Sequence, residues 1–357
     1  MSSLRFRGPL LPDGEPRDLY VVDGRVTYER VANAETVAEG WIVPGLVDAH
    51  CHVGLDEHGA VPPDVQEQQA LTDRDAGALL LRDCGSAADT SWIHQRDDLP
   101  RLIRAGRHIA RTRRYIRNFA HEIKPDDLAG YVAQEARRGD GWVKLVGDWI
   151  DRDAGDLTPS WTRDSLEAAM KVAHDNGARV TAHVFGEDAL PDLIGSGIDC
   201  IEHGTGLSAD LIDEMVAHGV ALVPTVRQLG NFPEYAEAGR KRFPAYADHM
   251  TRLFETRRQV IGSAYDAGVP IYAGTDAGGV LPHGLIAEEV VELASYGMTP
   301  SDALGAASWR ARSWLGLDDN LAEGTTADLV VFDRNPLEDL SVLQGPKRVV
   351  LRGAVVA

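Results

Sequence analysis

Between residues 46 and 320 the chain repeats one pattern, in which a short apolar segment is followed by an amphipathic helical stretch. The pattern is clearest between residues 159 and 226, where Thr162 is suited to begin a helix and Gly177 to end it. Regular alternation of strands and helices predicts βα units with parallel strands. The eight apolar segments cover residues 45–52, 78–86, 108–116, 142–148, 179–186, 198–205, 220–226 and 268–279.

Eight such units in about 275 residues predict an α/β fold of the (β/α)8 TIM-barrel type. A doubly wound open sheet is the alternative, but no glycine-rich dinucleotide-binding sequence follows the first predicted strand. In a TIM barrel the functional side chains lie at the carboxyl ends of the strands. These ends are therefore where we look for a site.

The two ends of the chain lack the strand–helix pattern. Residues 17–30 resemble a β-hairpin with Asp23-Gly24 at its turn, while residues 327–336 and 347–356 are further β segments with no helix between them. We expect these ends to pair. The predicted domains are a small β-sandwich from residues 1–44 and 321–357, and a (β/α)8 barrel from residues 45–320.

Composition narrows the choice of partners and compartment. The 357 residues carry a net charge of −19, spread along the chain, which disfavours nucleic acid and an anionic membrane as partners. No apolar run is long enough for a membrane span, and no secretory signal is visible. Three widely spaced cysteines predict reduced thiols. We therefore expect a cytoplasmic protein that acts on a small molecule. The sequence leaves open whether it forms a homo-oligomer.

Metal-ligand residue types stand at the ends of several predicted strands. His50 and His52 are two residues apart, so on a strand both point to one face and can bind one ion. Each of the remaining residues, taken alone, also fits a hydrogen-bonded strand end or a turn. Their shared position at strand ends favours a metal site. The candidate ligands are His50, His52, Lys144, His183, His203 and Asp276.

Lys144 lies in the middle of the apolar segment "WVKLV". A buried unpaired ammonium group costs several kcal/mol or loses its proton. The side chain therefore either reaches past the barrel rim to water or has a use inside the fold.

The motifs "PGLVDAHCH", "AHVFG", "IEHGT" and "AGTDAG" resemble those of the amidohydrolase superfamily, and the likeness extends over nearly the whole chain. Residues 168–190 and 197–226 are most similar to the branch with prolidase-like dipeptidases and imidazolonepropionase-like proteins. By this resemblance, Lys144 corresponds to the fourth-strand lysine that is carboxylated and bridges two metal ions.

The resemblance implies two divalent ions with carboxylated Lys144 between them. His50, His52 and Asp276 would bind one ion, and His183 and His203 the other. Zinc is the default for such ligands, and manganese, iron or cobalt also fit. A hydroxide between the ions would attack the substrate carbonyl, with Asp276 as general base and then acid. The expected reaction is hydrolysis of an amide-type C–N bond in a dipeptide, N-acyl amino acid, carbamate or cyclic amide.

Three alternatives are weighed against this reading. One is a mononuclear deaminase or imidazolonepropionase-like hydrolase; related deaminases commonly place glutamate three residues after the fifth-strand histidine, whereas this chain has Gly186 there and Glu187 next. Another is a lactonase or phosphotriesterase with the same metals. The last is a non-catalytic scaffold, which is disfavoured because all six ligand positions hold usable residues.

Three further residues are candidates for substrate contact: His121, Arg227 and His283. For each of them, the alternative is an ordinary residue at the surface or at the start of a helix. Residues 228–258 form the longest insertion and are predicted to be a specificity lid. Four aromatic residues in it suggest an apolar or aromatic substrate, although packing between helices explains them equally well. They are Phe232, Tyr235, Phe243 and Tyr246.

Overall fold

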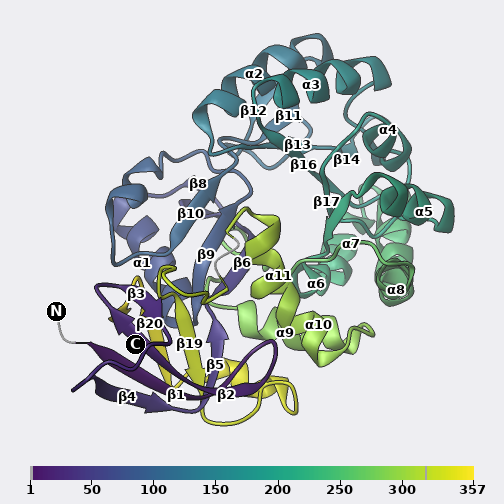
Figure 1. Cartoon of the computed structure of the whole chain (residues 1–357). Helices are drawn as coiled ribbons and strands as arrows, with labels where there is room; N and C mark the ends of the chain where they lie inside the picture. The colour runs from purple at the N-terminus through teal and green to yellow at the C-terminus, as the bar shows by residue number, and fades with distance from the viewer. Residues whose placement is uncertain (1–2, 318–319) are drawn as a thin grey trace.

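The structure, a computed structural model, describes residues 3–317 and 320–357. Met1, Ser2, Asp318 and Asp319 fall within the predicted domain ranges but lie outside the described residues. A large α/β region makes up most of the molecule, and a β-sheet that contains both chain ends lies on one side of it (Figure 1).

The parallel strands of the α/β region form two sheets. The first has the order β10-β9-β6 and the second the order β12-β11-β13-β16-β17-β18. Isolated bridges join residues 271–277 to β18 on one side and to β6 on the other. The strands are β6 (Leu46–Cys51), β9 (Ala78–Asp83), β10 (Arg101–Arg104), β11 (Ile109–Arg111), β12 (His121–Ile123), β13 (Trp142–Val146), β16 (Arg179–Val184), β17 (Cys200–His203) and β18 (Ala221–Val223).

The arrangement is TIM-barrel-like, but two predicted strands are less regular than expected. The predicted third strand, residues 108–116, is extended only over Ile109–Arg111, because the chain then turns through a left-handed residue, Arg113 with φ 63°. The predicted eighth strand forms bridges and no continuous ladder. Its end carries Asp276 with φ 58° and Gly278 with φ 104°, and such angles interrupt an extended strand.

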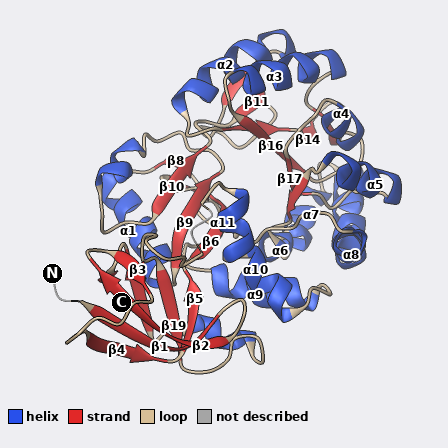
Figure 2. Ribbon diagram, in the orientation of Figure 1, coloured by secondary structure: helices blue, strands red, loops and turns tan. Residues whose placement is uncertain are grey.

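Helices lie outside the parallel strands (Figure 2). Thr162 caps α3 through a capping box with Ser165, and Gly177 follows the helix with φ 72°, as predicted. The helices are α1 (Pro63–Asp75), α2 (Leu128–Arg138), α3 (Arg163–Asp175), α4 (Leu190–Gly195), α5 (Ala209–His218), α6 (Val226–Leu229), α7 (Phe232–Arg240), α8 (Pro244–Ala267), α9 (Ile286–Ser295), α10 (Pro300–Ala306) and α11 (Trp309–Trp314).

Strands from both chain ends share one sheet, in the order β21-β20-β19-β5-β1-β2-β3, with β4 paired to β1. The predicted hairpin joins β2 to β3, and Asp23 and Gly24 have the positive φ angles that its tight turn requires. The domain boundaries at residues 44 and 320 stay a prediction. The strands are β1 (Leu4–Leu10), β2 (Glu15–Val22), β3 (Arg25–Thr27), β4 (Glu35–Glu39), β5 (Trp41–Pro44), β19 (Leu329–Phe332), β20 (Arg348–Leu351) and β21 (Ala354–Val355).

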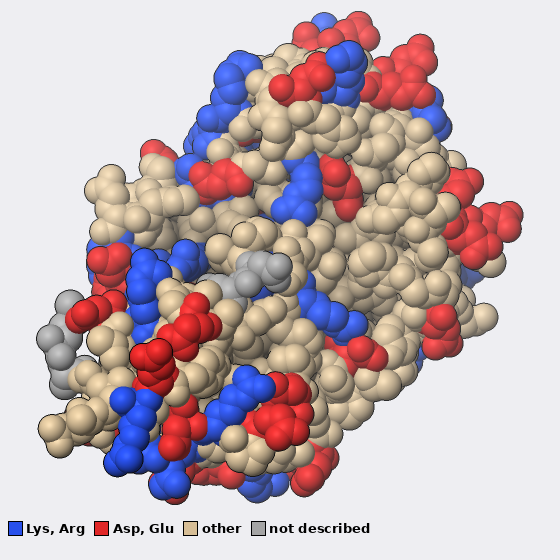
Figure 3. Space-filling view, in the orientation of Figure 1, with Lys and Arg blue, Asp and Glu red and all other residues tan. Residues whose placement is uncertain are grey.

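Two short hairpins extend from the α/β region. One joins β7 (Leu55–Asp56) to β8 (Gly59–Ala60), and the other joins β14 (Asp148–Asp151) to β15 (Asp156–Pro159). On the face drawn in Figure 3, acidic and basic side chains are interspersed over the terminal sheet. Within residues 3–317 and 320–357, no helix has the length and apolar character needed to cross a membrane.

Candidate metal centre and active-site cavity

Three of the predicted ligands meet at the carboxyl end of β6. The Nε2 atoms of His50 and His52 lie 3.2 Å apart, and Oδ1 of Asp276 lies 3.1 Å from the first and 3.0 Å from the second. Both histidines are buried, and the Asp276 side chain is 15% exposed. Imidazole nitrogens and a carboxylate oxygen that converge in this way are typical ligands of a divalent transition metal.

Backbone pairing brings Asp276 to the histidines. The Asp276 N–H donates to the His50 carbonyl at 2.7 Å, and the His52 N–H donates to the Ala277 carbonyl at 2.7 Å. Gly278 lies so close to His52 that a Cβ atom there would overlap the His52 carbonyl oxygen. Both φ angles of this turn are left-handed, so the chain accepts local strain where the carboxylate is presented.

In two of the histidines, the hydrogen bond made by Nδ1 determines that Nε2 carries the lone pair. His52 donates from Nδ1 to the Gly85 carbonyl at 2.8 Å. Thr225 donates its hydroxyl proton to the Pro224 carbonyl, so its oxygen accepts from Nδ1 of His203 at 2.7 Å. In both rings the Nε2 atom is left unprotonated and faces the centre. Such outer hydrogen bonds are what orient metal-binding histidines.

The second predicted ligand pair comes from β16 and β17. His183 Nδ1 lies 3.0 Å from His203 Nε2, and the rings of His203 and His50 are 5.5 Å apart. The buried Nε2 of His183 has no hydrogen-bond partner among the described residues. His203 has φ 67°, and this turn of the backbone lets both His203 and its neighbour Glu202 reach the centre.

Lys144 does not extend to solvent, since it is 1% exposed. Its Nζ donates to the buried carboxylate of Glu202. Thr181 also donates to that carboxylate at 2.8 Å, and Arg82 Nη2 lies 3.8 Å from it. Glu202 Oε1 is 3.6 Å from Nδ1 of His50. The lysine is therefore held inside the fold, beside the histidines.

Burial keeps the imidazoles neutral, which is the form that binds metals. Burial lowers the pKa of His50 to about 4 and the pKa of His203 to about 3. Burial also holds the pKa of His183 well below its usual range. Near neutral pH these rings are therefore uncharged, and each can offer one nitrogen lone pair, which together with the Asp276 carboxylate suits a divalent cation.

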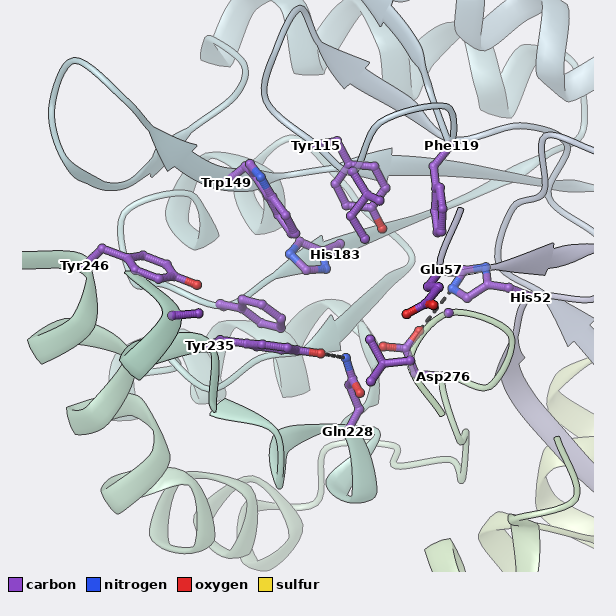
Figure 4. A pocket seen from close by; sticks show the side chains of 15 residues that line it. His52, Glu57, Tyr115, Phe119, Trp149, His183, Gln228, Tyr235, Tyr246 and Asp276 are labelled. Atoms are coloured by element: carbon purple, nitrogen blue, oxygen red, sulfur yellow. Dashed lines mark hydrogen bonds and ion pairs between the residues drawn. The ribbon is translucent and has the colours of Figure 1, made fainter. Parts of the chain in front are cut away.

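A cavity of about 370 Å³ opens onto the candidate centre. His52, His183 and Asp276 lie at one part of its wall, and aromatic side chains form most of the rest (Figure 4). Trp149 enters from the β14–β15 hairpin, and Tyr115 from the loop after β11. The cavity has the size and mainly apolar lining that are usual for a small-molecule site.

The predicted lid contributes directly to this cavity. Gln228, Tyr235, Ala238 and Tyr246 all line it. Phe232 instead is fully buried, with its ring 4.6 Å from that of Phe185. The 228–258 segment therefore forms both wall and packing, and two of its four aromatic residues reach the cavity.

The structure does not bring the three tentative substrate contacts to the cavity; none is among the described residues that line it. His121 Nε2 instead pairs with Glu135 of α2 at 3.0 Å. Arg227 Nη1 pairs with Glu292 of α9 at 2.9 Å.

His283 is buried, and its Nδ1 pairs with the Asp73 carboxylate of α1 at 2.7 Å. In all three cases a carboxylate on a neighbouring helix holds the side chain away from the cavity.

Several residues of the site escaped the sequence analysis. Glu202 stands directly before His203 in a buried strand, and a carboxylate in that position was the available signal. Tyr115 and Trp149 carry no local signal, because loops bring them to the cavity. The Gly85 carbonyl and the Thr225 hydroxyl act only through the histidines that they orient.

The fold and this ligand set are those of a class of hydrolases that generally bind divalent metals. The sequence profile of the amidohydrolase family matches residues 41–356, and the chain belongs to that family. The predicted resemblance and the TIM-barrel-like fold are thereby confirmed, as is the prediction of an enzyme; the number of ions and the state of Lys144 stay open.

The chain is 56% identical over 352 residues to an uncharacterized protein of Mycobacterium tuberculosis, covering 98% of this chain and 95% of that protein. It is 25% identical to the ochratoxinase of Aspergillus niger, over 86% of this chain and 73% of that protein. The crystal structure of a Xaa-Pro dipeptidase with bound methionine superposes with a TM-score of 0.83 and 22% identity, covering 99% of each chain. The likeness to the dipeptidase is one of fold.

Proposed function

We propose that the protein hydrolyses an amide-type C–N bond with two divalent metal ions, zinc by default. His50, His52 and Asp276 would hold one ion, and His183 and His203 the other. The observation that carries this proposal is the convergence of imidazole nitrogens and a carboxylate oxygen from β6, β17 and the 271–277 segment. The catalytic unit would be residues 45–320.

Lys144 is the proposed bridge between the two ions, as a carbamate formed with CO₂. The amine attacks CO₂, loses one proton, and keeps one N–H on Nζ. That remaining N–H has its acceptor in the structure, the carboxylate of Glu202.

Bound divalent ions lower the pKa of water toward about 7 and polarise a carbonyl oxygen. The residues of the chain then have separate tasks. Asp276 is placed to take the proton of the attacking water and to deliver it to the leaving nitrogen. Gly85 and Thr225 keep the neighbouring imidazoles in the required tautomer.

The deaminase alternative is weakened by the position of Glu187. Its Oε2 lies 2.6 Å from Nε2 of His249 in α8, so this carboxylate holds the lid helix. Glu187 is also absent from the described residues that line the cavity. It is therefore not available as the acid that a deaminase would need.

The test combines metal analysis with hydrolysis of Xaa-Pro dipeptides, N-acyl amino acids, carbamates and lactones. Protein loaded with Zn or Mn should contain two ions per chain and cleave a C–N substrate. Asp276→Asn should lower kcat by at least about 10³-fold, because the variant lacks the proton acceptor and one ligand. Undiminished turnover in this variant, or preferential cleavage of lactones, would contradict the proposal.

A further inference from the structure

The wall of the cavity is strongly aromatic. Six of its lining residues carry aromatic rings other than histidine, and three more are aliphatic: Tyr115, Phe119, Trp149, Phe185, Tyr235, Tyr246, Ile116, Ala238 and Val280. Tyr115 and Trp149 pack edge to face with ring centroids 4.9 Å apart, so this part of the wall is preformed. A flat apolar group of a substrate would be well accommodated here.

No lysine or arginine is found among the described residues that line the cavity. Two nearby arginines are already engaged. Arg114 donates to three backbone carbonyls of the β14–β15 hairpin and lies 3.5 Å from Asp151. Arg227 pairs with Glu292. The cavity therefore offers no cationic side chain to bind a substrate carboxylate.

The charged groups that do line the cavity are acidic. Asp276 and Glu57 both line it, and the Glu57 side chain is 72% exposed. Removing a carboxylate from water costs several kcal/mol unless a partner compensates for it. Acidic neighbours add repulsion instead of compensation, so a substrate with a free carboxylate should bind poorly away from the metal centre.

Neutral hydrogen-bonding groups are present in the cavity. Gln228 donates from Nε2 to the Tyr235 hydroxyl oxygen at 2.8 Å, which leaves the Tyr235 proton free to donate. The hydroxyls of Tyr115 and Tyr235 both point into the cavity, toward Asp276 (Figure 4). Tyrosyl O–H groups suit an uncharged carbonyl oxygen, such as that of an amide, carbamate or urea.

From this lining we infer that the enzyme acts on uncharged amides, carbamates or ureas with an aromatic or bulky apolar substituent, and discriminates against substrates with a free carboxylate, including dipeptides and N-acyl amino acids. The inference rests on the proposed hydrolytic function and narrows its substrate class. The aromatic wall behind it, with no lysine or arginine among the described lining residues, does not depend on the metal ligands.

A matched set of compounds tests the inference: N-acetyl-phenylalanine, its primary amide, and N-acetyl-2-phenylethylamine. All three share one secondary amide and one phenyl ring, and only the first carries a carboxylate. We expect kcat/KM for the two neutral compounds to exceed that for the acid by at least about 30-fold. An acid that is cleaved as well as its amide overturns the inference, and loss of that cleavage in Arg117→Ala would identify a loop arginine as the carboxylate anchor.

Charge substitution at the exposed cavity residue Val280 provides the matched variants. Val280→Arg supplies the missing cation, and we expect it to raise kcat/KM for the acid relative to the amide by about 10-fold. Val280→Met adds similar length without charge and should leave this ratio near that of the wild type. An unchanged ratio in Val280→Arg, or an equal rise in both variants, contradicts the inference.

Binding to the full chain separates this inference from the hydrolytic proposal. If none of the compounds is cleaved, the hydrolytic proposal is what fails for this panel. Calorimetric titration then reads the selectivity directly: the primary amide should bind at least about 10-fold more tightly than the acid. Binding of neither compound, or tighter binding of the acid, overturns the inference.

Discussion

Glu202→Gln tests the buried charge pair beneath the metal centre. The substitution keeps the size of the side chain and an oxygen that accepts from Thr181, but removes the negative charge beside Lys144. Arg82, which is also fully buried, loses the same partner at 3.8 Å. In protein freed of metal by a chelator, the variant therefore leaves two buried cations with less compensation.

The expected loss follows from this geometry. Breaking a buried ion pair by removing one partner costs about 3–5 kcal/mol, and the retained amide oxygen favours the lower value of about 3 kcal/mol. An unfolding entropy of about 2.1 cal/mol/K per residue gives about 0.75 kcal/mol/K for 357 residues. The free-energy loss therefore corresponds to a fall in Tm of about 4 °C.

Glu289→Gln is the matched control for differential scanning calorimetry. Glu289 is also fully buried, but it accepts from the backbone N–H groups of Val226 and Arg227, and burial raises its pKa well above the usual range. Among the described residues it has no ion-pair partner, so the substitution disturbs hydrogen bonds but breaks no charge pair, and we expect a loss of about 1 kcal/mol and a fall in Tm of about 1 °C. A Glu202→Gln protein that melts together with this control would refute the reasoning.

Other predictions concern the ligands and the lid. Lys144→Arg should reduce the metal content from two ions toward one, because a guanidinium cannot form a carbamate; two ions by elemental analysis would exclude the bridge. Gly278→Ala should lower the affinity for metal by at least about 10-fold, because the added Cβ displaces His52. At Gly279 a Cβ meets no atom within 4 Å, so Gly279→Ala is the control and should bind metal normally. His249 donates to the carboxylates of Asp156 and Glu187; these bonds raise the pKa of His249, and its bond to Glu187 lowers the pKa of that carboxyl. His249→Gln should therefore lower Tm most near pH 5.5, by about 2 °C, where the imidazole and the carboxylates are all charged, and least above pH 8. A loss of Tm that does not depend on pH would contradict this pairing.

The sequence predicted the parallel α/β arrangement because its signals are local. A helix cap such as Thr162 and a turn such as Asp23-Gly24 act within a few residues, and the structure confirms both. The six candidate ligands were found for a related reason, since parallel strands bring their carboxyl ends to one side of the sheet. The alternation of strands and helices along the chain was therefore enough to predict that the candidate ligands lie together at one end of the strands.

The tertiary structure alone decided what surrounds those ligands. His121 and Arg227 are directed away from the cavity by carboxylates on neighbouring helices, which no local pattern reveals. Glu202 joins the centre because a left-handed His203 lets two successive residues reach the same region. The aromatic, cation-free wall likewise combines loops that are distant in sequence. Substrate preference depends on such side-chain packing between separate elements, whereas the parallel α/β arrangement and the candidate ligands follow from periodicity within them.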